Sequence, residues 1–414
     1  MKYIRKNKLF ITIISILLTI SFYTECINRG QKEIVVVNNQ GEPFAGSAKC
    51  ASCHKEICSN FAHTAHNITS QPAFENTIKG SFDHGKNAYS YLYYTTVVME
   101  KTDSGLYQVL YNHGRKKSER RMDLVIGSGT RGQTFGTWAN NRIFQLPVSY
   151  LTSANAWCSS PGYPGFEPVF TRRITARCLE CHGTYFKDVS SSHHSAEFDH
   201  NQIIYGVQCE SCHGPGEKHV EFQQQNPGDA KGKYIINPSS FTKQQQLDLC
   251  SHCHNNRKDS RKPAFDFVPG DILADLEQPA DIKLDSQNLD VHGNQYGLLV
   301  ASKCFRMSGT ITCSTCHNTH QEERGKLGLF SQRCMTCHSE AKGNFCKMTE
   351  LPVSVIKTNC IDCHMPTKQS KILTLELEGK TRNTPATLRS HLITIYSAES
   401  KKFTSLMQPV SVKK

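Results

Sequence analysis

The stretch Gly206-Val-Gln-Cys-Glu-Ser-Cys-His-Gly-Pro-Gly216 contains the pattern Cys-x-x-Cys-His, in which a histidine follows directly after two cysteines spaced three positions apart. Two thiols at this spacing can form thioethers to the two vinyl groups of a haem, and the adjacent histidine can bind the iron as its proximal ligand. This chemistry needs all three residues at once. The stretch therefore predicts covalent attachment of haem c.

The same pattern occurs seven times and uses most of the 19 cysteines. Zinc knuckles and dithiol redox sites also use Cys-x-x-Cys pairs, but neither needs a histidine directly after the second cysteine. We therefore predict seven covalent haems c, each with the histidine of its motif as the proximal iron ligand. The motifs are Cys50/Cys53/His54, Cys178/Cys181/His182, Cys209/Cys212/His213, Cys250/Cys253/His254, Cys313/Cys316/His317, Cys334/Cys337/His338 and Cys360/Cys363/His364.

The composition fits a chain that completes its core with cofactors. Only 38% of the 414 residues are hydrophobic, and the net charge is +12. Two propionates on each of seven haems would add about −14 and bring the loaded protein near neutrality. The basic balance therefore does not predict a nucleic-acid partner.

Residues 1–26 resemble an export signal. Four basic residues within the first eight positions precede an apolar stretch at 9–23, which is short for a membrane span. Cys26 resembles a lipoprotein acceptor, although Tyr23 and Glu25 depart from the small residues usual before such a cysteine. Lipidation, ordinary cleavage and an uncleaved anchor all stay open. We expect an exported protein, periplasmic or on the outer surface, with the N-terminus as a means of membrane attachment.

The motifs are unevenly spaced and divide the chain into segments. Tyr89–Met99 and Leu106–Tyr111 are rich in aromatic and β-branched residues and predict a β-hairpin, with further strands at Met122–Ile126 and Arg142–Tyr150. We expect a mainly α and irregular multihaem core, with short helices around stacked haems and a small antiparallel β insertion. The predicted segments are a first haem segment at 45–87, the β-rich insertion at 88–175, three haem sites at 176–257, a linker at 258–300 and three haem sites with a distal-ligand tail at 301–395.

Twelve histidines remain for the distal side of the irons, enough for seven bis-histidine haems. His219 and His320 each follow a motif closely, as do His63 and His66. Because a helical neighbour three positions away cannot reach the opposite face of the same iron, we expect His320 to bind the iron of an adjacent haem. His252, inside the fourth motif, is either a ligand or a hydrogen-bonding residue at a haem edge.

Four further cysteines lie outside the motifs once Cys26 is set aside. These cysteines could form one or two disulfides or remain reduced, buried thiols, and the sequence does not determine a pairing. These residues are Cys58, Cys158, Cys304 and Cys346.

Several motifs carry a family resemblance. They are Gly46–His54, Gly206–Gly216, Thr312–His320 with the preceding Ser302–Phe305, and Cys360-Ile-Asp-Cys-His-Met-Pro366. Together they resemble bacterial multihaem cytochromes, similar to the tetratricopeptide-associated cytochrome c family within the group of the nitrifier tetrahaem cytochrome and the pentahaem nitrite reductases. The resemblance spans about residues 45–395, and no tetratricopeptide tail follows. It implies distal ligands at His66, His320 and His391.

Transfer of single electrons to and from redox partner proteins of the envelope is the leading functional hypothesis. The nitrite reductases mark their catalytic haem with lysine in place of the motif histidine, whereas all seven motifs here end in histidine, so we assign no catalytic residue. A reductase or oxidoreductase acting on a small nitrogen compound or peroxide at one open haem is the alternative, and a haem-bearing scaffold is a third. The basic run Arg115–Arg121 would attract anions to an open haem or form a solvated turn.

Overall fold

A computed structural model describes residues 34–163, 166–190, 196–255, 262–276, 289–378 and 383–407. The chain divides into two compact units, Met1–Val36 and Val37–Lys414. The predicted signal segment 1–26, with Cys26, lies outside the described residues. Within the described ranges, no helix has both the length and the apolar character needed to cross a membrane.

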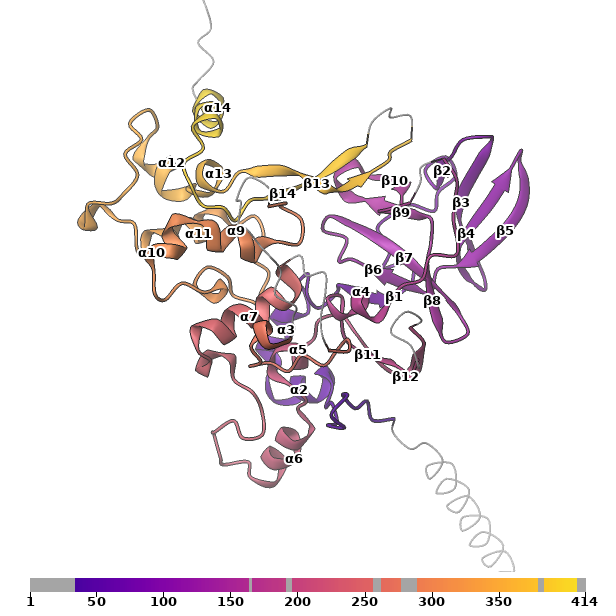
Figure 1. The fold of residues 1–414 in the computed structure, drawn as a ribbon, viewed down its shortest axis with the longest axis horizontal. Coiled ribbons are helices and arrows are strands. Elements are labelled where there is room, and N and C mark those ends of the chain that lie inside the picture. The colour runs from indigo at the N-terminus through magenta and orange to yellow at the C-terminus, as the bar shows by residue number, and fades with distance from the viewer. Residues whose placement is uncertain are drawn as a thin grey trace, which may run out of the picture. The chain divides into compact units, whose positions relative to one another are not determined.

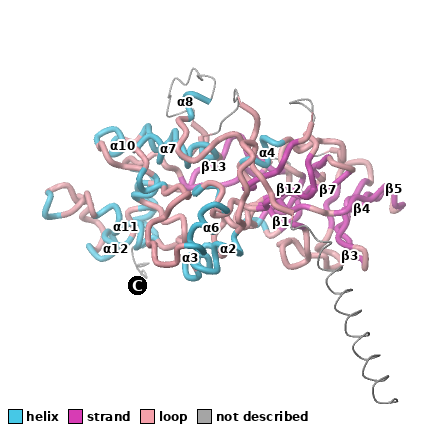
Figure 2. Tube along the Cα trace, turned by 90° about the horizontal axis from the view of Figure 1, so that it is seen from below, coloured by secondary structure: helices cyan, strands magenta, loops and turns pink. Residues whose placement is uncertain are grey.

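The expectation of a mainly α core is wrong. Helices account for 29% and strands for 25% of the structure, and the strands form four sheets with antiparallel pairing. Within the unit Val37–Lys414, strands β1–β10 gather at one end and helices α9–α14 at the other (Figures 1 and 2). The β structure is therefore a major part of the architecture and not a small insertion.

A four-stranded sheet contains the predicted hairpin. Its order is β2-β3-β4-β5, and β3 pairs with β4 from Thr95↔Asn112 to Thr102↔Gly105. The basic run that could have been a solvated turn forms the edge strand β5. The strands are β2 (Ala88–Ser90), β3 (Thr95–Thr102), β4 (Gly105–Asn112) and β5 (Arg115–Arg121).

A six-stranded sheet follows, with the order β1-β6-β7-β9-β10 and with β8 paired to β7. The strands expected at Met122–Ile126 and Arg142–Tyr150 are confirmed as β6, β8 and β9. The strands are β1 (Ser70–Pro72), β6 (Leu124–Ile126), β7 (Gly132–Ala139), β8 (Arg142–Gln145), β9 (Val148–Leu151) and β10 (Ala156–Ser159), and the 3₁₀ turn η1 (Thr152–Ala154) joins the last two.

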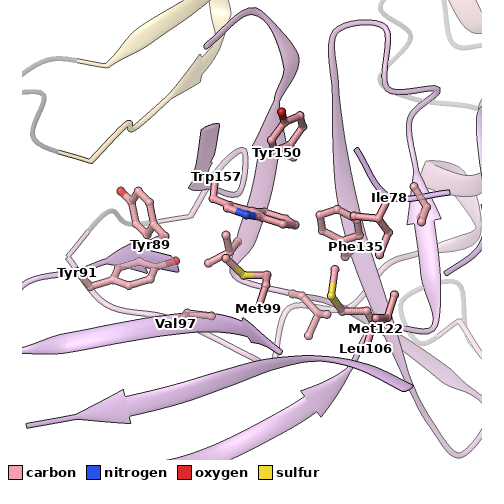
Figure 3. Close-up of a cluster of buried hydrophobic side chains, with 13 residues drawn as sticks. Ile78, Tyr89, Tyr91, Val97, Met99, Leu106, Met122, Phe135, Tyr150 and Trp157 are labelled. Carbon is pink, nitrogen blue, oxygen red and sulfur yellow. The ribbon is translucent and has the colours of Figure 1, made fainter. Parts of the chain in front are cut away.

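The largest apolar core lies between these two sheets. Trp157 is the centre of the cluster in Figure 3, where its indole packs near Phe135 and Tyr150, with ring centres 5.7 and 5.5 Å away. Val97 and Met99 enter from β3 and are fully buried. Because strand side chains alternate between faces, one face of the β2–β5 sheet covers this core and the other faces outward.

Two further strand pairs lie outside the predicted insertion. Strand β11 (Gly183–Asp188) pairs with β12 (Phe198–Tyr205), and β13 (Thr367–Leu375) pairs with β14 (Thr384–Arg389). Phe186 and Phe198 pack against each other in a second apolar core. Strand β11 starts directly after His182 and β13 starts three positions after His364, so the polypeptide around the haem motifs is not all helix and loop.

The helices are short. They are α2 (Ser47–Cys53), α3 (Lys55–Phe61), α4 (Ala176–Glu180), α5 (Glu210–His213), α6 (Glu217–Gln225), α7 (Lys243–His254), α8 (Leu273–Leu276), α9 (Gln295–Ala301), α10 (Lys303–Met307), α11 (Leu327–Met335), α12 (Val353–Thr358), α13 (Ile361–His364) and α14 (Ser397–Met407), with 3₁₀ turns η2 (Pro238–Ser240), η3 (Cys313–Thr315) and η4 (Glu340–Lys342). The predicted segment boundaries stay predictions, and α9 begins inside the stretch expected as a linker.

Candidate haem sites and their axial histidines

Each Cys-x-x-Cys-His motif lies on or at the end of a short helical turn. In five motifs the backbone N–H of the histidine donates to the carbonyl of the first cysteine, at 2.9–3.1 Å. A helical turn places residues three apart on one face, so the two sulfurs of a motif lie on the same side. This local geometry is what two thioether bonds to one haem require. The five histidines are His54, His213, His317, His338 and His364.

The motifs are not equally exposed. His182 is half-buried, with its Nδ1 atom inside the protein, and burial lowers its pKa. His54 and His338 lie at the surface. The attachment sites therefore range from the interior of the unit to its surface.

Four motif histidines have a partner for their Nδ1 atom. The Nδ1 of His213 lies 2.9 Å from the carbonyl of Ile236, and that of His364 lies 2.9 Å from the carbonyl of Thr394. His254 and His338 make longer contacts, 3.4 Å to Gln295 Oε1 and 3.3 Å to the carbonyl of Asn344. An acceptor at Nδ1 fixes the ring and leaves Nε2 for a metal.

The structure brings three of the four predicted distal histidines opposite a motif histidine. The ring centres of His66 and His254 are 6.2 Å apart. Those of His320 and His213 are 6.0 Å apart, and those of His391 and His317 are also 6.0 Å apart. In each pair the partner is distant in sequence, and His320 faces the third motif and not its own.

These separations fit an iron atom between two imidazoles. Two rings bound to one metal through bonds of about 2 Å, with each ring centre roughly 1 Å beyond its nitrogen, have centres about 6 Å apart. Rings in direct stacking contact would lie closer. The residues present therefore suit a bis-histidine iron site at three of the motifs.

Burial favours the neutral form of His66 and His391, which is the form of imidazole that binds metal. It lowers the pKa of His66 to about 4, and the charge of His254 adds to the effect. It also lowers the pKa of His391 to about 4, with a further contribution from His317. Within the described residues the buried Nδ1 of His391 has no partner at full hydrogen-bond geometry, and the backbone of Arg389 partly offsets the lowering of the pKa.

His219, the fourth predicted distal ligand, lies on α6 with its Nδ1 2.8 Å from the carbonyl of Lys233. That contact also leaves Nε2 available. Among the residues that the structure describes, no histidine ring pair of the kind above involves His219, His54, His338 or His364. The role of His219 as an iron ligand stays a prediction.

His292 is a residue that sequence reasoning did not single out. Burial lowers its pKa, and its charge lowers the pKa of His182, so the two side chains are close enough to interact. His292 lies far along the chain from any motif, with no local spacing to mark it. Only the tertiary fold identifies it as a candidate for the distal side of the second motif.

His252 makes contacts of another kind. Its ring stacks on Phe267 with centres 4.3 Å apart, and its Nε2 lies 3.6 Å from the buried carboxylate of Glu180. Glu180 belongs to the second motif and His252 to the fourth. These contacts favour a hydrogen-bonding role beside the haem sites over iron ligation.

Cysteines of different motifs approach one another. Four pairs of cysteine side chains from separate motifs lie close enough for each to affect the pKa of its partner. They make neighbours of the first and third, second and fourth, fourth and fifth, and sixth and seventh motifs. The pairs are Cys50 with Cys209, Cys181 with Cys253, Cys250 with Cys313 and Cys334 with Cys360.

The four cysteines outside the motifs that the structure describes carry free thiols. Cys158 is fully buried on β10, and Cys346 is exposed. Burial raises the pKa of Cys58 and of Cys304. The nearby Cys209 raises the pKa of Cys58 further, and the nearby Cys337 does the same for Cys304.

Comparison with known proteins points to the same class. Residues 164–214 match the family model described as cytochrome c554 and c-prime, and this range holds the second and third motifs. Over 193 residues the chain is 24% identical to the multiheme cytochrome MtrA of Shewanella baltica (strain OS185). These matches support a multihaem c-type cytochrome.

The similarity is partial. The aligned part covers 46% of this chain and 45% of the cytochrome from Shewanella baltica. No solved structure matches the chain. Covalently bound haem c is implied at the level of the family, and neither the number of haems nor a specific family beyond this is established by the matches.

Proposed function

We propose that this protein is a heptahaem c-type cytochrome that transfers single electrons between redox partner proteins of the bacterial cell envelope. Haem c supplies reversible one-electron exchange at its iron when bound. The role of the chain is to attach the haems, to set their axial ligands and to limit the access of water. The cytochromes that the chain resembles support this class of function.

The observation that carries the proposal is the set of three long-range histidine pairs. His66 with His254, His320 with His213 and His391 with His317 each combine a motif histidine with one from another part of the chain. Two imidazoles fill both axial positions of an iron, which favours electron exchange over the binding of a substrate.

The close approach of cysteines from different motifs supports transfer along a series of neighbouring sites. Cys181 lies against Cys253, and Cys250 of the same motif lies against Cys313. The fourth motif thus has neighbours on two sides. An attachment site with two neighbours can pass an electron on, whereas an isolated site can only store it.

The haem number is tested by intact mass spectrometry of the protein produced with haem-attachment machinery. We expect a mass increase equal to seven haems, and a loss of one haem when Cys334 and Cys337 are both replaced by serine. Replacement of Cys346, which lies outside the motifs, by serine is the matched control and should leave the mass increase unchanged. Bound zinc in place of haem would contradict the proposal.

The alternative function is a reductase that acts on a small nitrogen compound or peroxide at an open haem. Electron paramagnetic resonance of the oxidised protein distinguishes this enzyme from an electron carrier. Low-spin signals that nitrite, hydroxylamine and cyanide leave unchanged are the result expected for an electron carrier. A high-spin signal that shifts when one of these ligands is added would favour the enzyme.

Export and membrane attachment through residues 1–26 belong to the same proposal. The basic start, the apolar stretch and Cys26 support it. N-terminal sequencing and mass analysis of protein from the cell envelope would distinguish a lipid-modified Cys26 from a cleaved or an uncleaved N-terminus.

A further inference from the structure

The sheet β2-β3-β4-β5 ends in two adjacent hairpin tips with unusual side chains. The tip between β2 and β3 is Leu92-Tyr93-Tyr94, and these three side chains are 56%, 77% and 78% exposed. The tip between β4 and β5 is His113-Gly114. The rings of Tyr94 and His113 lie 4.8 Å apart, so the two tips form one surface. We call these five residues the tip surface.

The backbone at Tyr93 and Tyr94 is in the left-handed region, with φ of 57° and 56°. Tight hairpin turns with two positive φ values normally take Asn-Gly or Asp-Gly, because bulky residues are strained there. The turn itself closes through backbone bonds, from the N–H of Thr95 to the carbonyl of Leu92 and from the N–H of Tyr91 to the carbonyl of Thr95. The backbone bonds that close the turn do not require tyrosine side chains at these positions. Strained backbone at exposed bulky residues is often found where those residues have a functional role.

Cations border the tip surface. Arg115, Lys116 and Lys117 open the edge strand β5 and are exposed. Lys116 pairs with Glu119 at 2.8 Å, but within the described residues neither Arg115 nor Lys117 has an ionic partner. Lys117 is the extra residue of a bulge, since Leu110 pairs with Ser118 and Tyr111 with Lys116. Charges on an edge strand do prevent unwanted strand pairing, but that role does not explain the exposed Leu92, Tyr93 and Tyr94.

We propose that the tip surface, with Arg115 and Lys117, is a contact site for an anionic lipid bilayer. Tyrosine rings settle at the level of the lipid headgroups, and flanking lysine and arginine residues are drawn to anionic headgroups. A fluid bilayer accommodates protruding hairpin tips without a preformed complementary surface. The β2–β5 sheet lies at the end of the unit remote from helices α9–α14, so contact there leaves those helices accessible (Figures 1 and 2).

The test uses the full-length haem-loaded protein with Tyr94→Trp, and the emission of the native chain, which contains Trp138 and Trp157, is subtracted. The difference spectrum then reports on the tip surface and not on the N-terminus. The probes are vesicles of phosphatidylcholine, vesicles of phosphatidylcholine with phosphatidylglycerol, and soluble polyglutamate. We expect a shift of emission to shorter wavelength with the phosphatidylglycerol vesicles alone. Adding Arg115→Glu and Lys117→Glu should weaken the response roughly tenfold or more, as should high salt.

A matched control is Ile395→Trp, which places the probe at an exposed position between β14 and α14 and should show no shift. A Tyr94→Trp emission that stays unchanged while the protein sediments with the vesicles would overturn the proposal, since binding would then come from another part of the chain. An equal shift with polyglutamate would also overturn it and would indicate an acidic polypeptide as the ligand.

Discussion

The imidazole rings of His317 and His391 lie 6.0 Å apart, although one belongs to the fifth haem motif and the other follows the last strand, β14. The hydroxyl of Ser302 donates to the backbone carbonyl of His391 at 3.0 Å and accepts from the N–H of Ile393 at 2.8 Å. The main chain beside His391 is thus fixed independently of its ring. The ring itself is placed opposite His317 at the separation that a shared iron requires.

Replacing His391 by alanine should therefore remove one axial ligand without unfolding the segment. We expect one low-spin haem to become high-spin in electron paramagnetic resonance, because its distal position is vacated. Added imidazole should restore the low-spin signal. The backbone contacts with Ser302 do not involve the ring and should persist.

His200→Ala is the matched control for that variant. The Nε2 of His200 lies 3.0 Å from the carbonyl of Asn140, and its ring packs on Trp138 at 4.1 Å, so its contacts are explained without iron. Its loss should leave the spin state unchanged. An unaltered spectrum in His391→Ala would show that His391 is not a ligand.

The buried ion pair of Glu323 and Arg333 should stabilise the region between the fifth and sixth motifs. Two hydrogen bonds of 2.6 and 2.7 Å join the side chains, and Arg333 also donates to the carbonyl of Cys316 at 2.7 Å. Since Glu323→Gln removes the carboxylate that accepts two charge-assisted hydrogen bonds from Arg333, it should lower the free energy of unfolding by about 2 kcal/mol at neutral pH. Urea denaturation measures this difference.

The same pair predicts a pH dependence. Hydrogen bonding to Arg333 lowers the pKa of Glu323 from 4.5 to about 2 in the folded protein. Its contribution is fully present above the unfolded-state pKa and is lost as the pH falls from about 4.5 through about 2. The difference in unfolding free energy between the native chain and Glu323→Gln should therefore become smaller as the pH falls through that range. Glu340→Gln, which breaks the exposed pair with Lys357, should change stability little at any pH.

The thiols outside the haem motifs should differ in reactivity. Cys158 is fully buried, and burial raises its pKa to about 12, so iodoacetamide at neutral pH should modify it only after unfolding. Cys346 is exposed and should react in the folded protein. Mass spectrometry of digested protein distinguishes the two. Modification of Cys158 in the folded state at the rate of Cys346 would be inconsistent with its position on β10.

Gly80 should not tolerate a side chain. A Cβ atom at this position would fall on the indole ring of Trp157, at the centre of the core between the sheets. Gly80→Ala should therefore cost about 1–3 kcal/mol of stability through overpacking, detectable as a lower thermal midpoint. Gly228→Ala meets no atom within 4 Å and serves as the control. Equal midpoints for the two variants would contradict the packing described for Trp157.

Some of the β strands could be predicted from the sequence and others could not. The hairpin of β3 and β4 was predictable because both strands are neighbours in sequence and rich in β-branched and aromatic residues. The pairs β11–β12 and β13–β14 were not predicted, since each follows a motif histidine where short helices and loops were expected. Their residues become strands because a partner strand returns to them and a core covers Phe186 and Phe198.

The sequence by itself determined the chemistry of the attachment sites, because two thiols and an imidazole within five residues are a local arrangement that needs no tertiary contact to be recognised. It also identified His66, His320 and His391 as candidates for the distal side. Only the tertiary structure decided that they face His254, His213 and His317, and that His292 lies near His182. The reason is physical: an axial ligand on the far side of a haem must come from another part of the chain, and which part arrives there depends on the packing of the whole unit.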